Sequence, residues 1–194
     1  FYPGEAISSK IMAQLLKVAD NLITIDPHLH RYKSLNEAFK MKTKKLTANA
    51  LLAKFIKKNF KNDLIVGPDS ESFQWAESIA KIIGQHAVVL KKKRYTSRTV
   101  RIKLKDPLEF KGKDVVIVDD IISTGNTIIE AVRNIKKLGA RQFYCVAVHG
   151  VFVEKALEKL RKAKVKVVTT NTIPNSVGRI DVSSMVAQNL RKLK

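Results

Sequence analysis

The chain has 194 residues, of which 45% are apolar, and this is enough to bury the core of one large domain. No apolar run approaches the roughly 20 residues that a membrane helix requires, and a single cysteine, Cys145, excludes an internal disulfide framework, so we expect a cytoplasmic protein. The formal net charge of +20 indicates either anionic partners, such as nucleic acid or phosphorylated metabolites, or lysines that only solvate helix faces.

The first part of the chain predicts one helix and one strand. Apolar residues at helical spacing favour a helix over residues 6–19, and residues 21–26 are typical of a short buried strand. A polar connection then ends in a predicted helical turn, with Ser34 as its N-cap and Glu37 three residues later. The composition changes at residues 40–45, which we interpret as a hinge between a first segment, residues 1–45, and a domain at 46–194.

The rest of the chain alternates between strands and helices. The expected strands are residues 63–67, 86–94, 99–104, 114–120, 142–150 and 165–173, and the expected helices are 47–60, 71–83, 125–139, 154–163 and 183–193. This alternation predicts an α/β fold with a mainly parallel sheet covered by helices on both faces. Such sheets bind ligands at the carboxyl ends of their strands, where the sequence places Asp26, Asp69, Asp119 and His149.

The stretch VVIVDDIISTG, residues 115–125, joins a buried strand to a short turn through two adjacent carboxylates. Backbone N–H groups of such a turn and of the following helix face an anion, and Gly125 permits close approach of the backbone. The hydroxyls of Ser123, Thr124 and Thr127 can add donors. Asp119 and Asp120 then stand where a sugar would present its hydroxyls, so the stretch predicts a sugar-phosphate site. The alternative is a strand-to-helix turn with capping residues, which adjacent acids fit poorly.

The longer stretch VVIVDDIISTGNTI resembles the phosphoribosyl diphosphate motif of type I phosphoribosyltransferases and of ribose-phosphate diphosphokinases. Five other stretches resemble segments of the diphosphokinases in the same order: FYPGEAISSKIMAQLL, TIDPHLHRYKSL, IVGPDSESFQWAESIA, LKKKRYTSRTVRI and VTTNTI. The resemblance covers essentially the whole chain. It implies a type I phosphoribosyltransferase fold in which residues 46–194 form the second of two similar domains and residues 1–45 are the end of the first.

The resemblance also implies an activity for nucleotide biosynthesis, in which ATP and ribose 5-phosphate give 5-phosphoribosyl 1-diphosphate and AMP. Asp119 and Asp120 would take the ribose hydroxyls. The 5-phosphate would bind at Ser123, Thr124, Gly125, Asn126 and Thr127. The segment that precedes the chain in the family would supply much of the adenine pocket, so we expect the chain alone to bind ribose 5-phosphate better than it turns it over.

Two further pairs of residues take roles from the resemblance. His28 and Asp69 match the protein contacts to Mg²⁺, although Asp69 also suits a helix N-cap. Lys92 and Arg94 match a Lys-x-Arg pair on a loop over the transferring group, where positive donors stabilise charge on phosphate oxygens. The alternative for this basic run, which includes Lys91 and Lys93, is a solvated turn.

Three other functions remain open from the sequence. They are a phosphoribosyltransferase that consumes the diphosphate sugar, a non-catalytic relative that regulates an active enzyme, and a nucleic-acid-binding regulator on the same scaffold, suggested by the charge of +20. The resemblance favours ribose 5-phosphate and ATP as partners over nucleic acid or a membrane. It also implies a homo-oligomer.

Overall fold

The computed structural model describes residues 7–29, 32–60, 63–94, 100–103 and 107–193, with the backbone alone for 91–94, 100–103, 107, 108 and 193. The chain divides into two compact units, Phe1–Thr47 and Ala48–Lys194. Among the described residues, no helix is both long and apolar enough to cross a membrane.

The first unit contains a pair of parallel strands and three short helical segments. β1 (Asn21–Ile25) pairs with β2 (Lys42–Leu46), with Asn21 opposite Lys42 and Ile25 opposite Leu46. The helical segments are α1 (Ser8–Leu15) and two 3₁₀ turns, Leu16–Val18 and Leu35–Glu37. Most of the expected hinge, residues 40–45, lies in β2, and the boundary between the two compact units falls just after it, between Thr47 and Ala48. The helical turn at Leu35–Glu37 is confirmed, but the Ser34 side chain makes no capping bond there.

The second unit is built on a six-stranded, fully parallel sheet in the order β10-β9-β8-β7-β3-β4. Its strands are β3 (Leu64–Gly67), β4 (Ala87–Val89), β7 (Val115–Ile122), β8 (Phe143–Gly150), β9 (Val165–Thr170) and β10 (Gly178–Ile180). The helices are α2 (Asn49–Asn59), α3 (Phe73–Ile83), α4 (Asn126–Lys137), α5 (Ala156–Lys162) and α6 (Ser183–Leu190), with 3₁₀ turns at Pro107–Phe110, Val153–Lys155 and Arg191–Leu193. The predicted α/β class with a mainly parallel sheet is confirmed.

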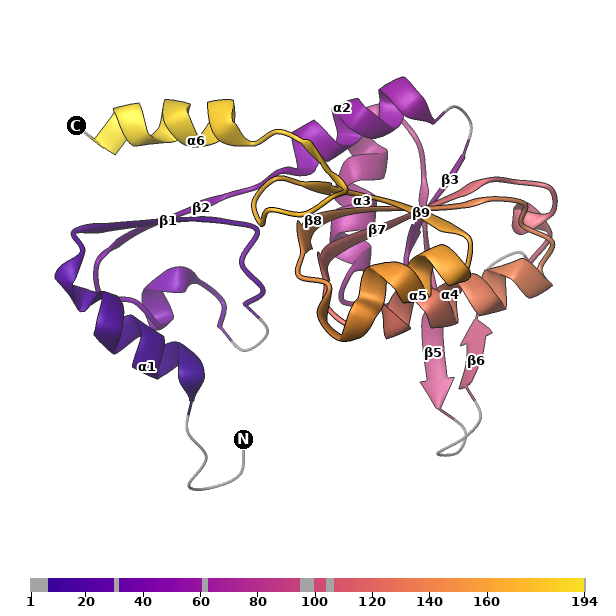
Figure 1. Ribbon diagram of the computed structural model, residues 1–194, viewed down its shortest axis with the longest axis horizontal. Helices are drawn as coiled ribbons and strands as arrows, with labels where there is room; N and C mark the ends of the chain where they lie inside the picture. Colours follow the sequence, from indigo (N-terminus) through magenta and orange to yellow (C-terminus); the bar gives the residue numbers. More distant parts are fainter. Residues whose placement is uncertain (1–6, 30–31, 61–62, 95–99, 104–106, 194) are drawn as a thin grey trace. The chain divides into compact units, whose positions relative to one another are not determined.

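Helices cover the two faces of this sheet in an order that follows from strand connectivity. The chain moves from β3 through α3 to β4 toward one edge, and from β7 through α4, β8 and α5 to β9 toward the other. Because parallel crossovers are right-handed, helices on the two routes lie on opposite faces, as Figure 1 shows for α3 against α4 and α5. The core between the layers is aliphatic and includes the buried residues Ile117, Ile128, Ile135 and Leu160.

The predicted strand at residues 86–94 is interrupted at the buried residue Leu90. Residues before it form β4, which pairs with β3, whereas β5 (Lys91–Arg94) pairs with β6 (Val100–Lys103) in a separate antiparallel ribbon. β10 was not predicted from the sequence. It has only three residues and pairs with the last two residues of β9.

Candidate sugar-phosphate site

The candidate site lies where the two routes of the sheet diverge, between the neighbouring strands β3 and β7. The helices that follow these two strands lie on opposite faces of the sheet, and at such a point parallel sheets bind ligands beyond the carboxyl ends of their strands. Asp69 follows β3, and Asp119 and Asp120 lie near the end of β7. β7 continues two residues beyond the predicted strand end, since Ile122 still pairs with Gly150 of β8.

Asp119 is held by contacts that the sequence did not predict. Its side chain is 6% exposed, and its Oδ1 atom accepts a 3.0 Å bond from the backbone N–H of Asp120. The Ser72 hydroxyl oxygen lies 2.8 Å from the same Asp119 Oδ1 and 3.0 Å from Asp69 Oδ1. Ser72 is itself buried, so one hydroxyl joins the loop after β3 to the carboxylate on β7.

This concentration of acids changes the protonation of Asp119. Burial raises the pKa of Asp119 to about 8, and the charges of Asp120 and Asp69 act in the same direction, while the hydrogen bond from Ser72 lowers it. A carboxyl group with this pKa is largely protonated at neutral pH. The site therefore favours any ligand that brings hydroxyl groups or positive charge, because either one compensates for the buried carboxylates.

Asp69 organises the start of α3. Its Oδ1 atom accepts bonds from the backbone N–H groups of Glu71, at 3.0 Å, and Ser72, at 2.9 Å, as well as from the Ser72 hydroxyl. The loop is tight, because a Cβ atom on Gly67 would lie only 2.7 Å from the Cα atom of Phe73. Asp69 Oδ1 therefore holds the turn that precedes α3, whereas the N-cap position of α3 itself is Ser72, which makes no side-chain capping bond.

The predicted phosphate turn is a tight connection into α4. Gly125 has a φ of +73°, which residues with a side chain rarely adopt, and a Cβ atom there would lie 3.3 Å from the side chain of Leu160. The first bond of the helix runs from Ile129 N–H to the Gly125 carbonyl, at 3.0 Å. The N–H groups of Asn126 and Thr127 precede it, so they belong to the helix end that attracts anions.

Side-chain exposure along the turn fits this interpretation. Ser123 and Asn126 are exposed, Thr124 and Thr127 are half-buried, and Gly125 is buried beneath them. Asn126 N–H makes a long, 3.4 Å bond to Thr124 Oγ1. Such a long bond is weak, so the turn can exchange it for a bond to a ligand.

The proposed metal ligands lie in different compact units. His28 belongs to the first unit and is exposed, whereas Asp69 belongs to the second. Within the described part of the chain, no three His, Cys, Asp or Glu side chains form a metal-binding group. The donors nevertheless suit Mg²⁺, which prefers carboxylate oxygens and retains waters, because Asp69 and Asp119 approach the same hydroxyl within 3.0 Å.

The proposed catalytic residues Lys92 and Arg94 are placed by their backbone only. They lie on β5, where Lys92 pairs with Ile102 and Arg94 with Val100. Their side chains, like those of Lys91 and Lys93, lie outside the described part of the structure.

His149, which the sequence places at a strand end, contacts another polar cluster. Its Nδ1 atom lies 2.9 Å from Thr172 Oγ1, and Thr170 Oγ1 donates to the Val148 carbonyl at 2.7 Å. These bonds join the ends of β8 and β9. The contact with Thr172 fits a structural role for His149.

Comparisons with known proteins agree with the fold. Residues 32–184 match the family model described as "Phosphoribosyl transferase domain". The chain is 36% identical over 195 residues to a ribose-phosphate pyrophosphokinase of Methanothermobacter thermautotrophicus and 35% identical over 186 residues to one of Pyrococcus abyssi. These matches cover 98% and 95% of the chain but only 66% and 64% of the two relatives.

Comparison with solved structures also points to this family and fold. A crystal structure of phosphoribosylpyrophosphate synthetase from Mycobacterium smegmatis matches 98% of the chain and 64% of its own length, with a TM-score of 0.82 and 27% identity. An orotate phosphoribosyltransferase from Aeropyrum pernix matches 75% of each chain with a TM-score of 0.54 at 19% identity, which shows a shared fold.

Proposed function

The chain belongs to the ribose-phosphate pyrophosphokinases, within the family of the phosphoribosyl transferase domain, and on that premise we propose that the protein containing it transfers the diphosphoryl group of ATP to ribose 5-phosphate. The products are 5-phosphoribosyl 1-diphosphate and AMP. The observation that carries this proposal is the pairing of two buried carboxylates, Asp119 and Asp120, with the Gly125 turn at the divergence of β3 and β7.

The ribose 5-phosphate site follows from that pairing. We assign the 2- and 3-hydroxyls of ribose to Asp119 and Asp120. The 5-phosphate binds the turn formed by Ser123, Thr124, Gly125, Asn126 and Thr127. The sugar phosphate supplies hydroxyls to carboxyl groups and an anion to helix N–H groups, so each end of the ligand meets a complementary group.

The transfer step needs positive charge around the diphosphate. The 1-hydroxyl oxygen of ribose forms a bond to the β-phosphorus of ATP. The bond from the β-phosphorus to the oxygen that bridges it to the α-phosphorus breaks, so AMP leaves, and the hydroxyl proton passes to solvent. We assign Lys92 and Arg94 to stabilise the charge on the transferring group. We assign His28 and Asp69 to hold Mg²⁺, whose contribution when bound is to neutralise diphosphate oxygens.

The remaining parts of the proposal concern the whole protein. The relatives are longer than this chain, and we propose that Phe1–Thr47 completes a first domain whose other part contributes to the ATP site. We also propose a homo-oligomer, by analogy with the family. A cytoplasmic location agrees with the free, buried thiol of Cys145.

The test is to follow AMP formation from ATP and ribose 5-phosphate by the full-length gene product with Mg²⁺. We expect turnover that falls by roughly 10²-fold or more in the Lys92→Ala/Arg94→Ala double variant. Lys91→Ala/Lys93→Ala is the matched control, since it removes the same charge from the same strand and should retain most of the activity. The proposal fails if the protein forms no AMP but releases diphosphate from 5-phosphoribosyl 1-diphosphate and a nucleobase.

A further inference from the structure

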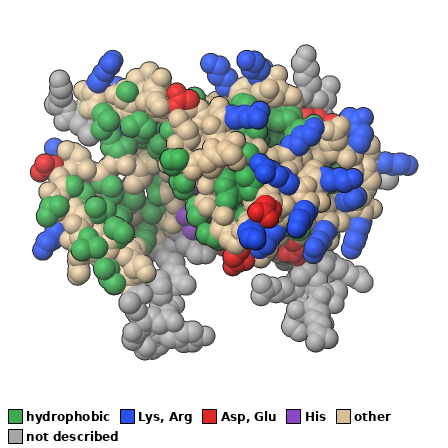
Figure 2. Space-filling view, in the orientation of Figure 1, with side chains coloured by type: hydrophobic (Ala, Val, Ile, Leu, Met, Phe, Trp, Pro, Cys, Tyr) green, Lys and Arg blue, Asp and Glu red, His purple; other side chains and the backbone are tan. Residues whose placement is uncertain are grey.

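Acidic side chains are scarce in this chain, yet three of them gather at the candidate sugar-phosphate site. The chain has 17 Asp and Glu residues against 37 Lys and Arg residues, and the face in Figure 2 likewise carries many basic side chains and few acidic ones. Asp69, Asp119 and Asp120 nevertheless lie near the ends of the neighbouring strands β3 and β7. Because like charges repel, such a cluster needs a group that holds its carboxylates in place.

The Ser72 hydroxyl is a group of this kind. Ser72 is 5% exposed, and its Oγ atom lies 2.8 Å from Asp119 Oδ1 and 3.0 Å from Asp69 Oδ1. A buried hydrogen bond to a carboxyl oxygen is stronger than the same bond in water, and it restricts the direction in which the carboxyl group points.

The backbone fixes the position of this hydroxyl. Ser72 N–H donates to Asp69 Oδ1 at 2.9 Å, and the N–H of Glu71 donates to the same oxygen at 3.0 Å. The next residue, Phe73, lies close to β3, because a Cβ atom on Gly67 would be only 2.7 Å from the Phe73 Cα atom. The chain is therefore held on both sides of Ser72, and its hydroxyl is in place before any ligand binds.

Helix capping does not account for the direction of the Ser72 side chain. Ser72 occupies the N-cap position of α3 but makes no side-chain capping bond. A serine at this position ordinarily accepts a bond from a backbone N–H two or three residues later. Here the hydroxyl contacts the carboxyl groups of Asp69 and Asp119. Its removal should therefore affect these carboxyl groups more than the helix.

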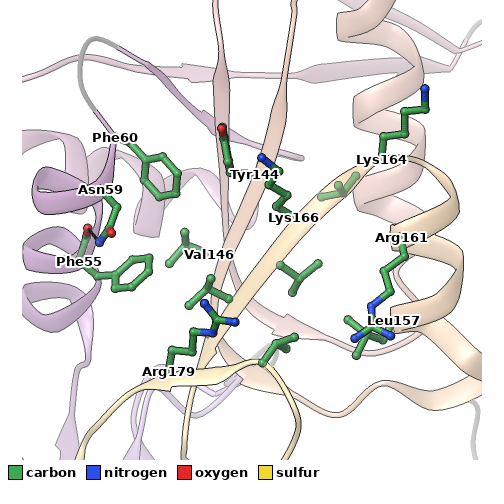
Figure 3. A pocket seen from close by; sticks show the side chains of 14 residues that line it. Phe55, Asn59, Phe60, Tyr144, Val146, Leu157, Arg161, Lys164, Lys166 and Arg179 are labelled. Atoms are coloured by element: carbon green, nitrogen blue, oxygen red, sulfur yellow. Dashed lines mark hydrogen bonds between the residues drawn. The ribbon is translucent and has the colours of Figure 1, made fainter.

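A pocket of about 650 Å³ follows β9 (Figure 3), but it offers sugar hydroxyls no carboxylate. None of the 14 residues that line it is acidic. Its lining is also divided by the sheet, since side chains alternate along a strand. Tyr144 and Lys166 pair with each other and face one side, whereas Val165 and Val167 face the other. Of these two places, only the site at β3 and β7 presents carboxyl groups to a sugar.

We propose that Ser72 is a positioning residue for sugar recognition: its hydroxyl orients the Asp119 carboxyl group, and this orientation selects a sugar phosphate that carries both the 2- and the 3-hydroxyl. The inference rests on the proposed ribose 5-phosphate site. Asp119 Oδ1 accepts bonds from the Ser72 hydroxyl and from Asp120 N–H, and two bonds to one oxygen oppose rotation of the carboxyl group. An oriented acceptor loses less entropy when a sugar hydroxyl binds, and it rejects a sugar without that hydroxyl more strongly.

The test is calorimetric titration of the full-length protein with ribose 5-phosphate and with its 2-deoxy and 3-deoxy analogues. The parent should bind ribose 5-phosphate at least about tenfold more tightly than either analogue. Ser72→Ala should weaken ribose 5-phosphate binding by about tenfold. The analogue that lacks the hydroxyl held by Asp119 should bind Ser72→Ala and the parent alike, so the preference against that analogue is lost, whereas the other analogue should weaken together with ribose 5-phosphate.

The outcomes separate this inference from the proposed function. Equal affinity of the parent for all three ligands would contradict the ribose site itself. A parent that prefers ribose 5-phosphate, together with a Ser72→Ala variant that keeps the same preference, would overturn the role of Ser72 alone. Equal weakening of all three ligands in Ser72→Ala would also overturn it, because the loss would then not depend on a sugar hydroxyl.

Two further variants isolate the hydroxyl. Ser70→Ala is the matched control, because Ser70 is an exposed serine of the same loop, and this variant should bind all three ligands as the parent does. Ser72→Thr keeps a hydroxyl and should retain most of the preference that Ser72→Ala loses. The same loss in both Ser72 variants would show that side-chain volume matters rather than the hydroxyl, and would contradict the proposal. Far-ultraviolet circular dichroism should be unchanged in every variant, and a lost helical signal in Ser72→Ala would instead show a structural role.

Discussion

Ser72 is the side chain that gives the candidate site its geometry. Its hydroxyl contacts carboxylates from two different strands, at 2.8 Å to Asp119 and 3.0 Å to Asp69. A hydroxyl has one proton to donate, so two ionised carboxylates leave one of these contacts without a hydrogen. A protonated Asp119 relieves that conflict, and a bound cation would relieve it as well.

The raised pKa of Asp119 predicts a specific pH dependence of stability. Between its ordinary pKa of 3.8 and the folded value of about 8, the folded protein holds a proton that the unfolded chain has lost. Stability contributed by that proton is therefore present below pH 4 and is lost as the pH rises toward 8. Asp119→Asn keeps an oxygen acceptor for Ser72 and Asp120 but removes the charge.

At pH 8 we expect the free energy of unfolding of Asp119→Asn to exceed that of the parent by a few kcal/mol as an order of magnitude, so that the variant unfolds at a higher urea concentration. This difference should vanish near pH 4. The same variant should lose affinity for ribose 5-phosphate. Urea unfolding at several pH values measures the first effect. A difference that is constant with pH would show that Asp119 titrates normally in the folded protein.

For single residues, the sequence predicts roles that depend on neighbours in the chain but not contacts between residues far apart in the chain. Asp119, Asp120 and the small residues after them are adjacent in the chain, so their joint chemistry is visible as a motif. Ser72 and Asp119 are 47 positions apart, and only the pairing of β3 with β7 brings them together. No local pattern in the sequence singles out Ser72.

The start of α4 depends on the backbone conformation at Gly125. Its φ of +73° disfavours any side chain, and a Cβ atom would also meet Leu160 of α5 at 3.3 Å. Gly84, which ends α3, has a similar φ of +76° but no atom within 4 Å of a Cβ position. An alanine at Gly84 would introduce backbone strain alone, whereas an alanine at Gly125 would introduce both backbone strain and a steric contact.

We expect Gly125→Ala and Gly84→Ala each to lose roughly 1–2 kcal/mol of stability from backbone strain. Only Gly125→Ala should also weaken ribose 5-phosphate binding, by about tenfold or 1.4 kcal/mol, because displacement of the turn moves the N–H groups that we propose bind the phosphate. Thermal unfolding and calorimetric titration measure the two effects. Equal binding by both variants would remove the turn from the phosphate site.

Strands and helices were predictable where periodicity extends over several residues. The helices α2, α3 and α4 each bury an apolar stripe, which the sequence shows directly. β10 has three residues and is defined by its partner β9 rather than by a pattern of its own. The run of lysines around residues 40–45 suggested a hinge, whereas pairing with β1 makes it a strand.

The whole chain combines two units of unequal burial. The helices α2 to α5 of the second unit bury apolar side chains, whereas α1 of the first unit and the terminal helix α6 bury none, and Leu15 and Val18 are 67% and 87% exposed. A segment with few buried contacts opens at low free-energy cost, so its backbone is accessible to proteases more often. Basic cleavage sites occur in both units, so the difference in burial decides which unit is cut first.

We expect limited digestion with trypsin to cut near Lys10 and Lys17 at least about tenfold faster than near Lys136 and Lys137, at the end of α4. A resistant fragment that begins close to Ala48 should accumulate, as mass spectrometry would show. Digestion in a denaturing concentration of urea is the control, because the sites should then be cut at similar rates. Early cleavage at Lys136 or Lys137 in the native protein would mean that buried side chains of α4 do not protect its backbone. The unequal stability that we infer for the two units would then be wrong.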